Sequence, residues 1–86
     1  MLEFFGRWFG RKRAVRTRLT RDEVLAIARH AAAHDALAPQ LIVTQVEVRA
    51  GLPVWIVSTE GRGLALEVSI DDSTGHVFSV QRVVRR

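Results

Sequence analysis

Two histidines at helical spacing are the side chains best arranged for metal chemistry in this sequence. His30 and His34 are four residues apart, with Asp35 beside the second, and on one helix face that spacing can hold zinc. Ala31 stands where metalloproteases carry a glutamate between the two histidines, and the sequence supplies no evident third ligand. We therefore expect solvated histidines and no metal site.

Two adjacent aspartates, Asp71 and Asp72, could form a carboxylate pair or part of a calcium loop. They open an Asp-Asp-Ser-Thr-Gly segment, and turn aspartates commonly hydrogen-bond to their own backbone. The second interpretation needs no ligand. We expect both residues to stabilise a turn.

The remaining candidates for catalysis lack the context that their chemistry needs. Gly61-Arg62-Gly63 has neither the length nor the lysine of a phosphate-binding loop. No nucleophile elbow surrounds any of the serines considered, which are Ser58, Ser69, Ser73 and Ser79. The sequence thus predicts a protein without catalytic residues or a cofactor.

Length and composition limit what can position any site. With 86 residues the chain has room for one domain, which buries only about 60% of the surface that the unfolded chain exposes. Apolar residues make up 48% of the chain, yet no apolar run approaches the roughly 20 residues of a transmembrane helix. The absence of cysteine excludes disulfides, thiolate catalysis and zinc–thiolate sites.

The formal charge of +4 is unevenly distributed. Between Asp22 and Gln81 there are three basic residues against eight acidic ones, so the excess of arginine lies at the two ends. No groove-recognition motif accompanies these arginines. A basic tail on an acidic body argues against sequence-specific binding of nucleic acid.

Residues 1–18 form a basic and aromatic leader. Its aromatic residues are followed at once by a basic cluster, and together they comprise Phe4, Phe5, Trp8, Phe9, Arg11, Lys12 and Arg13. Aromatic rings suit the headgroup region of an anionic bilayer, where each cation adds about 1 kcal/mol. This pattern predicts a peripheral membrane anchor. The alternative is a tail, or a segment that packs on its own domain or on a second copy of the chain. The apolar residues precede the charges, which is the wrong order for a secretory signal.

Thr20 and Glu23 predict the start of a helix. They can form a capping box, and Leu19 and Val24 occupy the two positions of a hydrophobic staple. Apolar residues then recur at helical spacing, and the helix should end near Leu37, before Pro39, after about four turns.

Beyond Pro39 the hydrophobic period changes from 3.6 to 2. Turn signals divide this part into strands over 42–49, 54–59, 64–70 and 77–83. We therefore expect an α+β fold in which one N-terminal helix packs on a four-stranded antiparallel meander sheet, with a single domain over residues 19–86.

Alternation along these strands assigns side chains to the two sheet faces. The set expected to face the helix is Ile42, Val46, Val48, Val54, Ile56, Leu64, Leu66, Val68, Ile70, Phe78 and Val80. The opposite face should bind a partner through Trp55, Val57 and Val77, with Glu47, Arg49, Glu67 and Gln81 around them. The alternative is that Trp55 turns inward or is covered by the leader.

The helix EVLAIARHAA and the later segment PVWIVSTEGRGLALEVSIDDSTGHVFSVQRV resemble the PepSY-like domains over about Thr20 to Val83. The resemblance implies a cystatin-like sheet with one helix. It also implies a non-catalytic role, either peptidase inhibition within propeptides or ligand binding at bacterial cell envelopes. This sequence departs from the family pattern because we find no secretion signal or peptidase domain in it. The same region is similar to small bacterial toxin-immunity proteins.

Together these features predict a bacterial, non-enzymatic domain that binds a protein or peptide through its open sheet face, with an inhibitory or regulatory role. Alternatives are an immunity protein with one tight protein partner, and an accessory protein held at a membrane surface by residues 1–13. A homodimer is a further candidate assembly. We expect a cytoplasmic protein, with peripheral association at the inner membrane face if the leader binds lipid.

Overall fold

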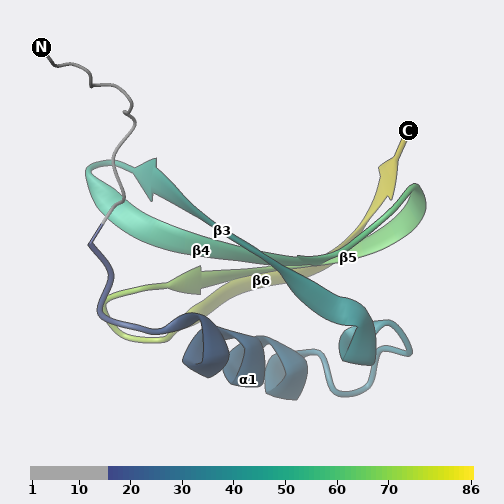
Figure 1. Ribbon diagram of the computed structural model, residues 1–86, viewed down its shortest axis with the longest axis horizontal. Helices are drawn as coiled ribbons and strands as arrows, with labels where there is room; N and C mark the ends of the chain where they lie inside the picture. Colours follow the sequence, from purple (N-terminus) through teal and green to yellow (C-terminus); the bar gives the residue numbers. More distant parts are fainter. Residues whose placement is uncertain (1–15) are drawn as a thin grey trace, which may run out of the picture.

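The computed structural model describes residues 16–86, which form one helix packed on a four-stranded antiparallel sheet (Figure 1). The helix α1 spans Arg21–Ala31 and is followed by a 3-10 turn, η1, over Ala38–Gln40. The strands are β3 (Leu41–Arg49), β4 (Leu52–Thr59), β5 (Gly63–Asp71) and β6 (Val77–Arg85). Their order in the sheet is β3-β4-β5-β6, so the predicted α+β meander is confirmed. None of the helices in residues 16–86 is long and apolar enough to cross a membrane.

The start of α1 follows the predicted capping box. The Thr20 hydroxyl accepts a hydrogen bond from the Glu23 backbone N–H at 3.2 Å, and the Thr20 N–H donates to the Glu23 carboxylate at 2.8 Å. The helix is shorter than expected, because it ends at Ala31 rather than near Leu37. Asp35 accepts a hydrogen bond from the Leu37 N–H at 2.8 Å, which stabilises a turn in place of further helix.

One buried cluster joins α1 to the sheet. Its members are Val24, Leu25, Ala28, Ala32, Ala38, Leu41, Trp55, Val57, Leu66, Val68 and Ile70. In Figure 1 the helix lies across one face of a twisted, curved sheet, and no helix of the described chain lies on the other face. We call this second face the uncovered face.

The expected assignment of side chains to faces is partly wrong. Trp55 and Val57 belong to the core beneath α1, and Val77 packs against that core. Register explains this arrangement, since Trp55 pairs with Ile70 and Val57 with Val68 across β4 and β5. The alternative in which Trp55 turns inward is therefore confirmed.

The alternate side chains of β4, Val54 and Ile56, consequently face away from the helix. Val54 pairs with Glu47 and Asp71, and Ile56 pairs with Gln45 and Ser69. Phe78 also departs from the expected face. A register shift in the β5–β6 ladder pairs Ile70 with Val77 and Ser69 with Ser79, so Phe78 is the extra residue of a bulge.

Candidate functional site: the uncovered sheet face

A buried carboxylate fixes which side of β4 faces the helix. Asp72 is 3% exposed and accepts hydrogen bonds from the Trp55 indole Nε1 at 2.9 Å and from two backbone N–H groups. These groups are Arg18 N at 2.7 Å and Leu19 N at 3.0 Å. Burial raises the pKa of Asp72, but these three donors outweigh it, and the pKa lies below its usual value.

Asp71 has the turn role expected of both aspartates. Its carboxylate accepts from the Ser73 N–H at 3.0 Å, from the Ser73 hydroxyl at 2.9 Å and from the Thr74 hydroxyl at 3.0 Å. The hydrogen bonds from Ser73 are the main cause that holds the pKa of Asp71 below its usual value. Asp72 turns away from this loop, so the expectation of a shared turn role is wrong for the second aspartate.

Part of the uncovered face is apolar and tightly packed. Val54 is 4% exposed, Ile56 7% and Ala65 1%, although no helix of residues 16–86 lies over them. All residues of β4 from Val54 to Thr59 are buried. The centre of the face is therefore a firm apolar floor rather than a loose surface.

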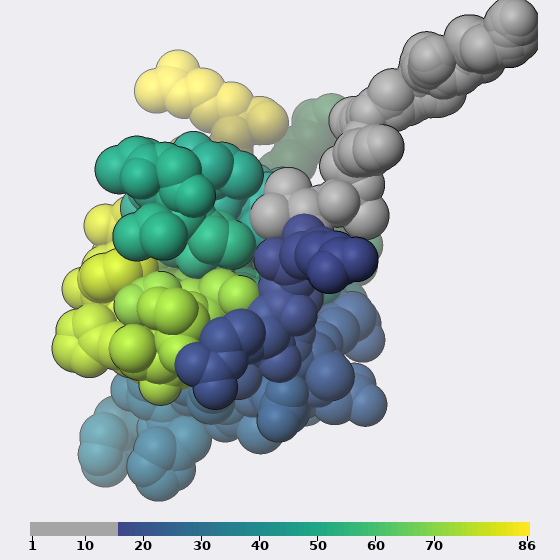
Figure 2. All heavy atoms as spheres, turned by 90° about the vertical axis from the view of Figure 1, so that its left-hand side faces the viewer, coloured from purple at the N-terminus to yellow at the C-terminus, as the bar shows by residue number. Residues whose placement is uncertain are grey.

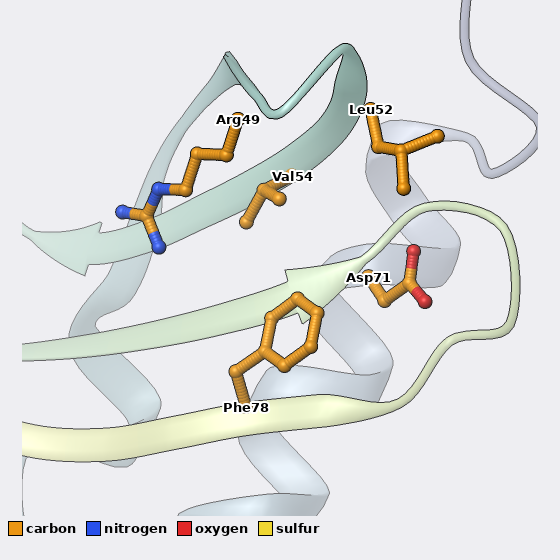
Figure 3. Close-up of a pocket in the computed structure, with 5 residues that line it drawn as sticks. All are labelled: Arg49, Leu52, Val54, Asp71 and Phe78. Atoms are coloured by element: carbon orange, nitrogen blue, oxygen red, sulfur yellow. The ribbon is translucent and has the colours of Figure 1, made fainter.

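A groove of about 290 Å³ opens at one end of this face, between the β3–β4 hairpin and β6. We define it by the residues that line it: Arg49, Leu52, Val54, Asp71 and Phe78. Figure 3 shows Arg49 and Leu52 on either side of Val54, with the Phe78 ring projecting toward Val54 from β6. Leu52 is 59% exposed and Phe78 54% exposed, so two large apolar side chains border the opening.

The charged groups of the groove already have partners. The Arg49 guanidinium lies 3.1 Å from Glu47, and the Asp71 carboxylate is bound by Ser73 and Thr74. The Phe78 ring is held by edge-to-face contact with His76, with ring centroids 5.7 Å apart. The groove thus offers an apolar slot with paired charges at its edge, which suits a hydrophobic side chain more than a charged substrate.

A second polar pair lies further along the same face. Glu67 is 3.3 Å from Arg85, whose guanidinium also donates to the Thr59 carbonyl at 2.6 Å. Gln81 is the cross-strand partner of Glu67. The uncovered face therefore has an apolar centre, an apolar groove at one end and ion-paired polar groups around them.

The structure separates the residues that the sequence grouped as a partner site. Glu47, Arg49, Glu67 and Gln81 lie on the uncovered face as expected, whereas Trp55, Val57 and Val77 lie on the helix side. His30 and His34 are exposed, and no cluster of three potential metal-ligating side chains exists within residues 16–86. The proposed membrane-surface residues, from Phe4 to Arg13, lie outside the described residues.

Sequence reasoning missed three groove residues, Leu52, Val54 and Phe78. Leu52 lies within the turn predicted over residues 50–53, and alternation alone assigns Val54 and Phe78 to the helix-facing core. Asp72 could have indicated the orientation of β4. A buried indole N–H needs a hydrogen-bond acceptor, and the Asp72 carboxylate supplies it for Trp55.

Comparison with known proteins identified no relative of this chain. No protein-family model matches the chain, and neither a curated protein nor a solved structure matches it significantly.

Proposed function

We propose that this chain is a non-catalytic, PepSY-like binding domain that takes a hydrophobic side chain of a protein or peptide into the groove. The observation that carries the proposal is the pairing of half-exposed Leu52 and Phe78 across an apolar floor. Exposed apolar surface rimmed by polar groups marks interaction sites. Its use as a binding site explains why large apolar side chains border an opening on this face.

The size and the electrostatics of the groove support a side chain as its ligand. Small-molecule sites occupy about 300–1,000 Å³, so a groove of about 290 Å³ is at their lower limit. It can take one large apolar side chain. An aspartate is already charged at neutral pH, and the hydrogen bonds from Ser73 and Thr74 lower the pKa of Asp71 further, which disfavours a role as a general acid.

Selection of peptides against the full chain tests this function. A library of random peptides should yield binders with an aromatic or large aliphatic anchor. In nuclear magnetic resonance titrations these peptides should shift the signals of Leu52, Val54 and Phe78. Phe78→Asp should weaken their binding at least tenfold, because it places a charge inside an apolar slot.

The matched control is Val84→Asp, at an exposed position of the same strand that pairs with Leu64 at the far end of the sheet. It adds the same charge and should leave peptide binding unchanged. Thermal unfolding must show that both variants fold. Peptides that bind the two variants equally well, or a library that yields no binder, would refute the proposed function.

A further inference from the structure

The described chain begins at the same end of the sheet as the groove. The Arg18 and Leu19 backbone N–H groups bind Asp72, and the Arg18 guanidinium donates to the Ser73 carbonyl at 2.7 Å. The Asp72 N–H donates to the Pro53 carbonyl at 3.3 Å. Asp72 and Pro53 each adjoin a groove residue, Asp71 and Leu52. In Figure 2 the purple segment that begins at residue 16 runs along the yellow-green turn between β5 and β6. The segment before Arg16 is therefore attached at the end of the sheet where the groove opens.

Residues 1–15 carry the side chains that such a groove would take. They hold four of the six aromatic residues of the chain, namely Phe4, Phe5, Trp8 and Phe9. The other two already have places, Trp55 in the core and Phe78 at the groove. Phe9 precedes Arg18 by nine positions, and this stretch can span up to about 30 Å when extended, which is ample to reach a site at the same end of the sheet.

Proximity also favours this occupant. A short tether provides an effective concentration in the millimolar range, so even a weak aromatic contact would be populated.

We propose that an aromatic side chain from residues 4–9 docks in the groove of its own chain, between Leu52 and Phe78. Residues 1–15 then act as an internal competitor for the partner. The docking stands on the groove and the tether alone, whereas the competition rests on the proposed function. This occupant is preferred to a second copy because the tether holds it next to the site at any protein concentration.

Paramagnetic broadening in the full chain tests the docking directly. A nitroxide on Gly10→Cys leaves all four aromatic residues in place, and the chain has no other cysteine. We expect strong broadening of the Leu52 and Val54 methyl signals and little at Leu64 and Val84, which pair at the far end of the sheet. Phe78→Ala should weaken the broadening at Leu52 and Val54 to the level that the tether alone produces, while Val84→Ala should leave it unchanged.

Two other results would overturn the docking. In a mixed sample, one set of chains carries the nitroxide and the other set carries the isotope label but no nitroxide. Broadening that appears only in this mixture would assign the groove to a second copy. Broadening of Leu52 and Val54 that Phe78→Ala leaves unchanged, together with a Trp8 fluorescence shift only on adding vesicles of anionic phospholipid, would assign the aromatic residues to a membrane surface.

The competition is tested with the selected peptides and a full chain carrying Phe4→Ser, Phe5→Ser, Trp8→Ser and Phe9→Ser. If the leader fills the groove nine-tenths of the time, this variant should bind peptide about tenfold more tightly. Unchanged affinity would refute the competition. Broadening at the groove without any peptide binder would leave the docking intact and refute the proposed function, so the two failures are distinguishable.

Discussion

Asp72 shows how one side chain can decide the orientation of a strand. A buried carboxylate without partners would cost several kcal/mol, so the fold must supply donors. Two come from the backbone of Arg18 and Leu19, and the third is the Trp55 indole. Because the indole must reach Asp72, Trp55 cannot lie on the uncovered face.

Substitution of Trp55 should reveal this core role. Trp55→Ala is expected to cost about 3–5 kcal/mol of unfolding free energy, since it removes a large buried side chain. Trp55→Phe should cost less, because most of the apolar volume remains while the hydrogen bond to a charged group, worth about 1.5–3 kcal/mol, is lost. Urea unfolding measures both, and Val84→Ala, at a position 74% exposed, is the control expected within about 0.5 kcal/mol. A loss below 1 kcal/mol for Trp55→Ala would contradict the core assignment.

Asp72 should also contribute to acid unfolding. Its pKa is lower in the folded chain than the value of about 3.9 in an unfolded one, so its stabilisation is complete above that value and is lost as pH falls through the folded pKa. Asp72→Asn should lower stability at pH 7 and flatten the pH dependence below about pH 4. Asp35 and Asp71, whose pKa values are also lowered, should maintain part of the slope. Urea titrations between pH 2 and 7 measure this, and an unchanged slope would exclude Asp72 as a contributor.

At the scale of elements, local chemistry was the most predictable part of this chain. The capping box and the turn residues act on their immediate neighbours, so Thr20, Glu23 and the Asp71 turn could be identified from sequence. The helix C-terminus was less predictable. Alanine favours continued helix through residues 31–33, and only the turn at Asp35, tied to Arg82 at 2.7 Å, competes with it.

The two faces of β4 could not be told apart by pattern. The segment VWIVST is apolar at both parities, and the structure buries both. Alternation therefore could not decide which pair faces the helix, Val54 and Ile56 or Trp55 and Val57. The bulge at Phe78 added a second error, because one extra residue reverses the face of the side chains on one side of it.

The N-terminal cap of α1 offers a test at this scale. Thr20→Ala should lower the free energy of unfolding by about 1 kcal/mol, because the Glu23 N–H loses its acceptor. Thr20→Ser keeps a hydroxyl at the same position and should recover most of the loss. Thermal and urea unfolding compare the three proteins, and equal stability of the alanine and serine variants would argue against the cap.

At the scale of the whole molecule, α1 is attached to the sheet at both flanks. The Arg21 guanidinium donates to the Ile42 carbonyl at 2.9 Å and that of Arg29 to the Leu41 carbonyl at 2.8 Å, both on the edge strand β3. At the other edge, Arg82 of β6 pairs with Asp35. The first strand and the last strand are thus both connected to the helical layer.

The boundary of the folded domain lies earlier than residue 19, since Arg18 already binds Asp72. Deletion of residues 1–15 should preserve cooperative unfolding and the buried environment of Trp55. Deletion of residues 1–19 removes two of the three donors to a buried carboxylate and should cost at least about 2 kcal/mol. Urea unfolding followed by Trp55 fluorescence distinguishes them. Equal stability of the two truncated chains would show that the backbone donors at 18 and 19 contribute little.

The bond between Arg18 and Asp72 also has a consequence for the order of folding. Each strand of the meander pairs with its predecessor, so hairpins can form one after another as a chain leaves the ribosome. The Asp72 contacts cannot form in this way, because Asp72 lies 54 positions after Arg18 in the chain. Until Asp72 emerges, the Trp55 indole lacks its acceptor and the segment before α1 has nowhere to anchor. A nascent chain halted before residue 72 should form α1 and the β3–β4 hairpin, but its Trp55 side chain should not yet adopt one orientation. Formation of the β5–β6 hairpin should then complete the tertiary structure in a single late step.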